Sequence, residues 1–356
     1  MGNQKRKRIQ ALDVSAVDLF CGAAGLSLGL QQSGIPIAAG IDLYPACRFP
    51  FERNIGARFL EQDVSTLKSE TVIELFGSAK VRVLAGCAPC QPFSGYTTKR
   101  RAIDRRWKLL LQFLRIVQET CPEIVTLENV PRLAHLPLWR EFVAGLEAHG
   151  YFVTWNILDV SKFGVPQSRR RLVLLASRLG PIDLPKSRTQ KPITVKKAIG
   201  RLPKVTAGVA NPHDPLHSSR ALTPRNLARI KKSKPAGTWR EWPKRMRAAC
   251  HTTETGKTYP SVYGRMSWDK PSPTITTQFY GFGNGRFGHP EQDRAITLRE
   301  GAILQSFPDD FQFAPDGVRI NFRGLGKLIG NAVPPQLGRA IGDAIVTHIS
   351  GTETNR

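Results

Sequence analysis

Short runs of apolar and β-branched residues recur through the first half of the chain, and each run ends at a polar residue or a glycine. These runs are AVDLF (16–20), IAAGID (37–42), VRVLAG (81–86), IVTLEN (124–129) and RLVLLAS (171–177). A stretch in which apolar residues recur with helical spacing, LLLQFLRIVQET (109–120), lies among them. Strands that alternate with helices predict an α/β fold built on a parallel sheet. In such a sheet, ligands bind beyond the carboxyl ends of the strands.

This regular pattern ends near Pro181. From there to about Arg265 the chain is rich in Pro, Lys, Arg, Ser and Thr and shows no clear periodicity. Regular spacing returns in LREGAILQSF (298–307), and GRAIGDAIVTHI (338–349) predicts a closing helix. Because 356 residues exceed the size at which one core usually stays undivided, we expect two domains. The smaller, irregular domain is inserted into the large α/β domain.

Positive charge is concentrated in the irregular region. The whole chain carries 52 Lys and Arg against 28 Asp and Glu, a net charge of +24. The segment from Lys186 to Arg247 holds 17 of the basic residues and only two acids, a net +15. Such an excess favours a polyanionic partner. An anionic membrane surface is the alternative to nucleic acid, but the basic stretches lack an amphipathic helical period. We expect no membrane association.

Cysteine usage indicates the cellular compartment. Six cysteines are spread over 356 residues, and we identify neither a signal peptide nor an apolar run long enough to span a bilayer. Disulfides are therefore not expected, and the setting is a reducing cytoplasm.

A nucleotide-like ligand is indicated by DLFCGAAGLSLGL (18–30), which predicts a strand, a turn and the start of a helix. Free N–H groups at such a helix start bind polar ligand groups, although Gly22 and Gly25 suit a tight turn equally well. Asp42 ends the next strand, at the spacing where an acid takes ribose hydroxyls. Asp63, in EQDVSTL, is placed to hold an adenine amine. Each acid alone fits an ordinary cap or turn, but the ordered set favours the ligand.

The stretch GCAPCQPFSGYT (86–97) contains a Cys-x-x-Cys formed by Cys87 and Cys90. A zinc site needs two more ligands, and no second Cys-x-x-Cys or His-x₃-His occurs. A thioredoxin-like dithiol is typical of a small domain near a βαβ start. The remaining possibility is a single thiol at the end of a strand, in a loop bracketed by Pro89 and Pro92. Cys90 is the better placed nucleophile, with an inert buried thiol as the alternative, and Cys87 is expected to be a small packed residue.

Two further segments supply partners for such a thiol. Glu128, in LENVPRL, ends another predicted strand, so it and Cys90 can project into one crevice. Arg169 and Arg171, in GVPQSRRRL, lie before or within a strand, where a period of two places both on one face. Phosphate contact is the alternative role for these arginines.

The chain resembles the cytosine C5 DNA methyltransferases of the bacterial modification type. The resemblance is carried, in order, by DLFCGAAG, Asp42, Asp63, GCAPCQPFS, LENV, GVPQSRRR, a variable basic region, RMSWDKPSPTITT (265–277) and GNAVPP (330–335). It covers residues 16–349. Two positions differ from the commonest pattern, since Ala24 stands where the family often has Gly and Asp42 where it often has Glu.

The resemblance implies specific roles. S-adenosylmethionine is the expected cofactor, with no metal, and its predicted binding residues are Phe20, Gly22, Gly25, Leu26, Asp42, Asp63, Pro89 and Asn331. The predicted catalytic residues are Cys90 as nucleophile, Glu128 at cytosine N3, and Arg169 and Arg171 as supports for the base. The implied fold is a Rossmann-like methyltransferase sheet with an inserted target-recognition domain.

The resemblance also implies an organisation and partners. We expect the first part of a catalytic and cofactor-binding domain in 1–184, a target-recognition domain in 185–297, a hinge in 298–325 and a return to the catalytic domain in 326–356. The expected partner is double-stranded DNA, with the target cytosine flipped out of the duplex. We expect the basic window, residues 186–247, to grip the DNA together with the aromatic residues Trp239, Trp242 and Tyr259. We expect a monomer in the bacterial cytoplasm, associated with the nucleoid, and a cognate restriction endonuclease where one exists. The alternatives are an RNA cytosine methyltransferase and a DNA-binding regulator that has lost catalysis.

Overall fold

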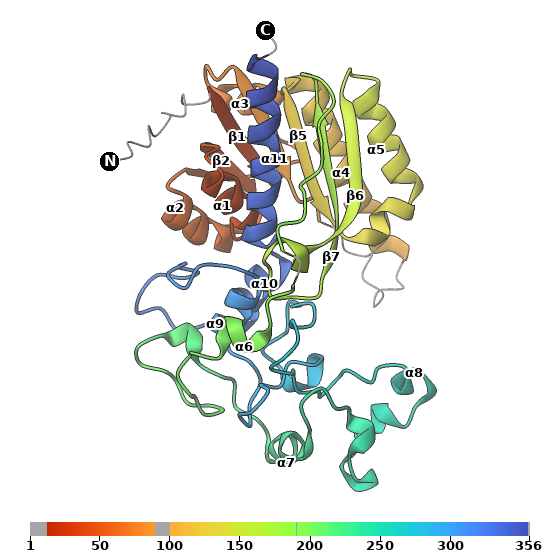
Figure 1. Cartoon of the computed structure of the whole chain (residues 1–356), viewed down its shortest axis with the longest axis vertical. Coiled ribbons are helices and arrows are strands. Elements are labelled where there is room, and N and C mark those ends of the chain that lie inside the picture. The colour runs from red at the N-terminus through yellow and green to blue at the C-terminus, as the bar shows by residue number, and fades with distance from the viewer. Residues whose placement is uncertain (1–12, 90–99, 190, 355–356) are drawn as a thin grey trace, which may run out of the picture.

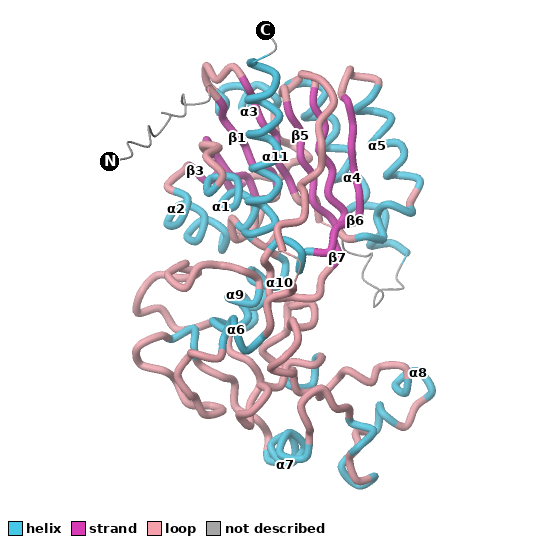
Figure 2. The backbone as a smooth tube through the Cα atoms, viewed as in Figure 1, coloured by secondary structure: helices cyan, strands magenta, loops and turns pink. Residues whose placement is uncertain are grey.

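The computed structural model describes residues 13–89, 100–189 and 191–354. Figure 1 shows two parts stacked along the long axis, with a sheet covered by helices in the upper part. The lower part is built mostly from loops and short helices, as Figure 2 shows by colour. This lower part, called the small part below, contains the irregular region of the sequence and part of the chain that follows it.

The upper part contains a seven-stranded sheet in the order β3-β2-β1-β4-β5-β7-β6. Its strands are β1 (Val14–Leu19), β2 (Ile37–Asp42), β3 (Arg58–Glu61), β4 (Val81–Gly86), β5 (Ile124–Asn129), β6 (Phe152–Asp159) and β7 (Arg170–Ser177). All five runs expected to be strands form strands, and those over 37–42, 81–86 and 124–129 have the expected bounds. The α/β fold class is therefore confirmed.

The expectation of a purely parallel sheet is wrong at one edge. Strands β1 to β5 pair in parallel, but β7 runs antiparallel to both β5 and β6. The connection between β6 and β7 is only residues 160–169, whereas parallel neighbours need a crossover of about a dozen residues or more. Two strands were not expected at all: β3 has four residues, and β6 is a partly exposed edge strand.

Helices cover both faces of the sheet (Figure 1). They are α1 (Gly25–Gln32), α2 (Arg48–Ile55), α3 (Ser69–Phe76), α4 (Arg100–Thr120), α5 (Pro137–Glu147) and α11 (Pro335–Thr354). The predicted closing helix is α11, which packs against α1. The backbones touch at their crossing, because a Cβ on Gly29 would lie 2.4 Å from the backbone nitrogen of Arg339. The end of the chain therefore completes the layer beside β1.

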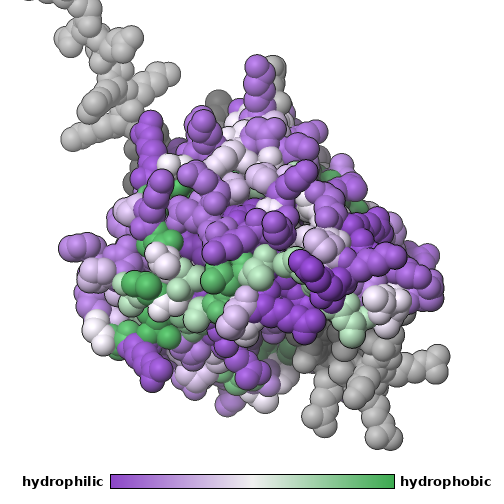
Figure 3. Space-filling view, turned by 90° about the horizontal axis from the view of Figure 1, so that it is seen from below, coloured by the Kyte–Doolittle hydropathy of each residue, from purple (hydrophilic) through white to green (hydrophobic). Residues whose placement is uncertain are grey.

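The small part holds short helices and, among its described residues, no strand longer than an isolated bridge. Its α-helices, with those that join it to the sheet, are α6 (Val195–Ile199), α7 (Pro224–Lys232), α8 (Glu254–Lys257), α9 (Leu298–Leu304) and α10 (Phe322–Asn331). The 3₁₀ turns of the chain are Pro45–Cys47, Pro131–His135, Val160–Phe163, Pro215–His217, Trp239–Glu241, Lys244–Met246, Ala249–His251 and Phe282–Asn284. Seen from below, hydrophilic residues cover most of this face, with a band of apolar residues between them (Figure 3).

Aromatic residues of the basic window form a core rather than a DNA-contacting surface. Trp239 and Trp242 are 3% and 2% exposed, and the Trp239 ring stacks on His251 with centroids 4.3 Å apart. The expectation that both tryptophans grip DNA is therefore wrong, because a domain with little regular structure uses them to build its interior. Tyr259, by contrast, is 41% exposed.

Candidate active site

A cavity of about 340 Å³ opens at the carboxyl ends of β1, β2 and β4. It is lined by Asp18, Phe20, Cys21, Gly22, Ala23, Leu26, Asp42, Tyr44, Cys47, Cys87, Ala88, Pro89, Lys327, Leu328, Asn331, Ala332 and Val333. Six of the eight predicted cofactor residues are in this lining, and they come from four separate segments of the chain. The cavity lies where an open α/β sheet binds its ligands.

The turn between β1 and α1 forms one wall of this cavity. Phe20, Gly22 and Ala24 have φ of 60°, 53° and 64°, so the backbone passes through the left-handed region three times. The N–H of Gly22 donates to Asp42 Oδ2 over 3.0 Å, which fixes the turn against the end of β2. Ala24, where the family often has Gly, is buried and keeps the left-handed conformation despite its Cβ.

Asp42 is held in place from two sides. Besides the bond from Gly22, its Oδ1 accepts the backbone N–H of Tyr44 over 2.8 Å. Burial raises the pKa of this carboxyl, while the two backbone N–H groups and the nearby Lys327 oppose that shift. Asp42 thus presents a fixed carboxyl group at the end of its strand.

Gly25 and Asp63 lie outside the lining of the cavity. A Cβ on Gly25 would lie 2.0 Å from the carbonyl oxygen of Val333, so this glycine permits close packing of the C-terminal segment on α1. Asp63 accepts the backbone N–H of Ser65 over 2.8 Å and forms a local turn. The turn at Asp63 matches the alternative that the sequence left open, whereas the close packing at Gly25 was not expected. A ligand contact by either residue stays a prediction.

Asp18 is a functional candidate that the sequence interpretation missed. It lies within β1, is 1% exposed, and lines the cavity. Its Oδ2 accepts the hydroxyl of Ser27 over 2.5 Å, while Oδ1 is buried without a hydrogen-bond partner among the described residues. Burial raises the pKa of Asp18 to about 7, and the neighbouring Asp42 adds to the shift. An acid inside an otherwise apolar strand was the available signal.

Glu128 is the centre of a second cluster, at the edge of this cavity. It lies near the end of β5 and is 3% exposed. Its Oε1 lies 2.9 Å from Nε of Arg171, on the neighbouring strand β7. Its Oε2 accepts the thiol of Cys87 over 2.9 Å. Cys87 was expected only to pack, but it also contacts the predicted catalytic acid, because β4 and β5 are adjacent and end at the same edge.

The loop after β4 is attached to this cluster. The side-chain amide of Asn129 donates to the carbonyl oxygen of Ala88 over 3.0 Å, which holds the loop against the end of β5. Cys90, the predicted nucleophile, is one residue beyond Pro89 and lies outside the described residues. The start of its loop, residues 87–89, is thus fixed beside Glu128.

Arg169 and Gln167 join the sheet to the small part. Arg169 is 5% exposed, and its Nη1 donates to the carbonyl oxygen of Ile275 over 3.0 Å. Gln167 accepts the backbone N–H of Ile275 over 2.9 Å and donates to the carbonyl oxygen of Leu304 over 3.1 Å. The described contacts of Arg169 therefore differ from those of Arg171, which reaches Glu128.

A family model described as C-5 cytosine-specific DNA methylase matches residues 14–347. The chain belongs to this family. It is 43% identical to the type II methylase M.HgiDII of Herpetosiphon aurantiacus, over 95% of this chain and 96% of that protein. It is 32% identical to the type II methyltransferase M1.HphI of Haemophilus parahaemolyticus, over 95% and 88% of the two chains. The protein is a DNA (cytosine-5)-methyltransferase.

Solved structures share the fold of this methyltransferase. A putative DNA modification methyltransferase encoded within a prophage of E. coli matches with a TM-score of 0.72 at 20% identity, over 94% of this chain and 99% of that one. A DNMT2 from Spodoptera frugiperda matches with a TM-score of 0.61 at 16% identity, over 94% and 98%. These likenesses confirm the methyltransferase sheet with its antiparallel β5-β7-β6 edge.

The described residues contain neither a metal-binding cluster nor a membrane-spanning helix. Within 13–89, 100–189 and 191–354, no group of three or more His, Cys, Asp or Glu side chains is arranged to hold a metal ion. In the same segments, no helix combines the length and apolar character needed to cross a bilayer.

Proposed function

We propose that this methyltransferase is a type II modification enzyme that methylates C5 of one cytosine within a specific duplex sequence, with S-adenosylmethionine as donor. The observation that carries the proposal is the Cys87–Glu128–Arg171 cluster, which adjoins the cavity and the start of the Cys90 loop. The names of the type II relatives support the modification role.

The lining of the cavity fits S-adenosylmethionine, the cofactor of this family. Asp42 presents a fixed carboxyl to ribose hydroxyls, and the unpaired Oδ1 of Asp18 offers a second buried oxygen. Phe20, Leu26 and Val333 provide apolar surface. When bound, S-adenosylmethionine supplies an electrophilic methyl group. The family's use of this cofactor and the polar and apolar composition of the cavity support the assignment together.

Cys90 is assigned the nucleophilic step. Cytosine C5 is too electron-poor to attack a methyl group directly, so a thiolate first adds to C6 and converts the ring into an enamine-like nucleophile. Cys90 forms this carbon–sulfur bond. After C5 gains the methyl group, loss of the C5 proton expels the Cys90 thiolate and restores the aromatic ring.

Glu128 is assigned to N3 of the cytosine. Charge develops across N3 as Cys90 adds, so an acid held at that nitrogen stabilises the adduct. Arg171 and Cys87 fix one oxygen each of this carboxyl, and such fixed geometry lowers the reorganisation needed during reaction. Arg171 also holds the base carbonyl, and Arg169 supports the extruded base from its position at the joint with the small part.

The small part is assigned to DNA recognition. The reaction needs a base outside the stack, so the target cytosine is flipped into the site. We propose that DNA lies between the two parts, that 185–297 recognises the target sequence, and that 298–325 acts as a hinge before the chain returns in 326–356. The enzyme acts as a monomer in the bacterial cytoplasm, and a restriction endonuclease for the same site accompanies it where the pair exists.

Transfer of labelled methyl groups tests this proposal. Purified enzyme is given S-adenosylmethionine with duplex DNA in one arm and transfer RNA in the other, and bisulfite sequencing maps the methylated cytosines. We expect label in DNA at a single sequence. Label only in RNA supports the RNA methyltransferase alternative, and no label with retained DNA binding supports a non-catalytic regulator. Cys90→Ser abolishes transfer, while Cys250→Ser, at an exposed cysteine of the small part, keeps it.

A further inference from the structure

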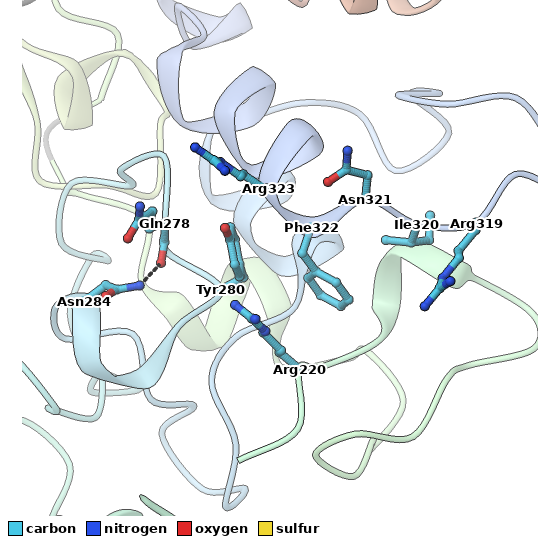
Figure 4. A pocket seen from close by; sticks show the side chains of 9 residues that line it. All are labelled: Arg220, Gln278, Tyr280, Asn284, Arg319, Ile320, Asn321, Phe322 and Arg323. Carbon is cyan, nitrogen blue, oxygen red and sulfur yellow. Dashed lines mark hydrogen bonds between the residues drawn. The ribbon is translucent and has the colours of Figure 1, made fainter. Parts of the chain in front are cut away.

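A second hollow lies where the small part meets the first turn of α10. Its volume is about 600 Å³, and Figure 4 shows the side chains around it. Its polar lining consists of three arginines, Arg220, Arg319 and Arg323, and three amides, Gln278, Asn284 and Asn321. None of its lining residues is a carboxylate. The hollow is therefore positively charged.

The arginines of this hollow differ from others nearby. Buried Arg294 lies 2.7 Å from Glu300, and Arg299 lies 2.7 Å from Asp214, so these cations serve the interior of the protein. Arg319 and Arg323 are exposed and have neither an ion pair nor a hydrogen bond to any residue in the described segments. Their charge is not neutralised within the protein, which leaves it available to an anionic partner.

Two aromatic rings form a rigid floor between these arginines (Figure 4). The centroids of Tyr280 and Phe322 are 5.7 Å apart, and the Arg220 guanidinium lies 6.0 Å from the Tyr280 ring. Tyr280 packs directly on α10, because a Cβ on Gly326 would lie 2.4 Å from its ring. The floor thus joins an arginine of the small part to the start of α10.

Helix α10 also relates the hollow to the catalytic site. Lys327, Leu328 and Asn331, nearer its other end, line the cofactor cavity. At about 1.5 Å rise per residue, Arg323 lies about 12 Å along the helix from Asn331. Successive phosphates of one strand are about 3.4 Å apart along the duplex axis, so a span of about 12 Å equals about three or four phosphate spacings.

We propose that the hollow binds backbone phosphates of the duplex a few nucleotides away from the flipped cytosine. This inference rests on the proposed function, which brings DNA to the joint between the two parts. Guanidinium groups match phosphate oxygens in bidentate geometry, and amide side chains are common secondary phosphate donors. Phosphate contacts carry no direct sequence information. The hollow therefore adds affinity and register for cognate and non-cognate duplexes alike.

The test compares DNA binding of three proteins as a function of salt. The wild type, the double variant Arg319→Gln/Arg323→Gln and the control Arg178→Gln are titrated with cognate and non-cognate duplex between 50 and 200 mM salt. Arg178 is exposed and follows β7, which is antiparallel to β5, so it lies at the edge of the sheet opposite the active site. The logarithm of the binding constant falls linearly with the logarithm of the salt concentration, and each lost phosphate contact makes this slope less steep by about 0.9. Between 50 and 200 mM salt, one contact therefore changes the salt-induced loss of affinity by about 3.5-fold.

We expect the salt dependence of binding by the double variant to be less steep than that of the wild type by about 1.8 in the log–log slope, equally for both duplexes. Arg178→Gln should keep the wild-type slope. A double variant with an unchanged slope, or one that weakens only the cognate duplex, overturns the proposal. A second outcome is that inorganic phosphate raises the melting temperature of the wild type but not of the double variant, while both proteins show the same salt dependence of DNA binding. The hollow then binds a small anion instead of DNA. Because binding is measured without turnover, a wild type that does not methylate refutes the proposed function and leaves this test intact.

Discussion

The contact between Cys87 and Glu128 gives a prediction that separates positioning from packing. The substitutions are Cys87→Ala, which removes the donor, and Cys87→Ser, which keeps one at the same place. A hydrogen bond to a charged group contributes about 1.5 to 3 kcal/mol, and a thiol is a weak donor, so the lower end applies. A loss of about 1.5 kcal/mol corresponds to about a tenfold lower rate.

The assay measures kcat and both KM values by labelled methyl transfer under reducing conditions. We expect Cys87→Ala to lower kcat about tenfold, because Glu128 is then fixed by Arg171 alone, and we expect little change in KM for DNA. Cys87→Ser should stay within about threefold of the wild type, since its hydroxyl still donates. Cys87 also lines the cofactor cavity, so the affinity for S-adenosylmethionine is measured separately.

Three results would refute this reasoning. An alanine variant as active as the wild type shows that the thiol only packs. A rise in KM for S-adenosylmethionine without a fall in kcat assigns Cys87 to the cofactor instead. A serine variant as inactive as Cys90→Ser restores the dithiol alternative.

The other predictions concern separate parts of the enzyme. The pKa of Asp18 is about 7 in the folded protein and 3.8 in the unfolded chain, so between these values only the folded protein holds the proton. Its contribution to the free energy of unfolding therefore falls by about 1.4 kcal/mol per pH unit as the pH rises from 4 to 7. Asp18→Asn should remove this slope, and urea unfolding at pH 5 and 7 checks it; parallel curves for variant and wild type contradict it. Gly25→Ala should destabilise the protein by about 1 to 3 kcal/mol, because the added Cβ clashes with the carbonyl oxygen of Val333. Thermal unfolding without cofactor measures this loss, and a variant as stable as the wild type would contradict it. Exchanging 185–261 with the same region of a relative should move the methylated site in bisulfite sequencing, and an active chimera with the old site contradicts the assignment.

The buried strands of the sheet were predictable because they are apolar on both faces. Apolar residues fill most positions of β4 and β5, and the bounds of both strands match those expected from the sequence. β6 was missed because it is an edge strand in which three of eight residues are exposed and none is fully buried, which weakens the apolar signal. The antiparallel direction of β7 depends on the short connection before it, and without β6 that connection was not visible.

The site was predictable where a residue type is tied to a strand end. Asp42 and Glu128 end apolar runs, so the edge of the sheet brings Asp42 into the lining of the cavity and Glu128 to the cluster at its edge. Asp18 was missed because it lies inside its strand, whereas ligand-binding acids were expected only at strand ends. Trp239 and Trp242 were misassigned because composition does not reveal which residues cover an aromatic ring.

The partners of arginines were equally hidden from the sequence. Arg319 and Arg323 lie outside the segment with the highest charge density, but no residue in the described part of the chain neutralises their positive charge. Inside that segment, Arg229 donates to the carbonyl oxygen of Met246 and helps to build the fold. Net charge therefore predicted a nucleic-acid partner, whereas the three-dimensional contacts are needed to say which cations remain available for it.

Covalent trapping tests the central claim, that Cys90 attacks C6 of the target cytosine, most directly. A cognate duplex carrying 5-fluorocytosine cannot lose its C5 substituent as a proton, so the enzyme should remain attached to it in the presence of S-adenosylmethionine. Peptide mapping of that adduct should place the bond on Cys90, and Cys90→Ser should form none. A bond on Cys87, or turnover of the duplex without any adduct, would contradict the account.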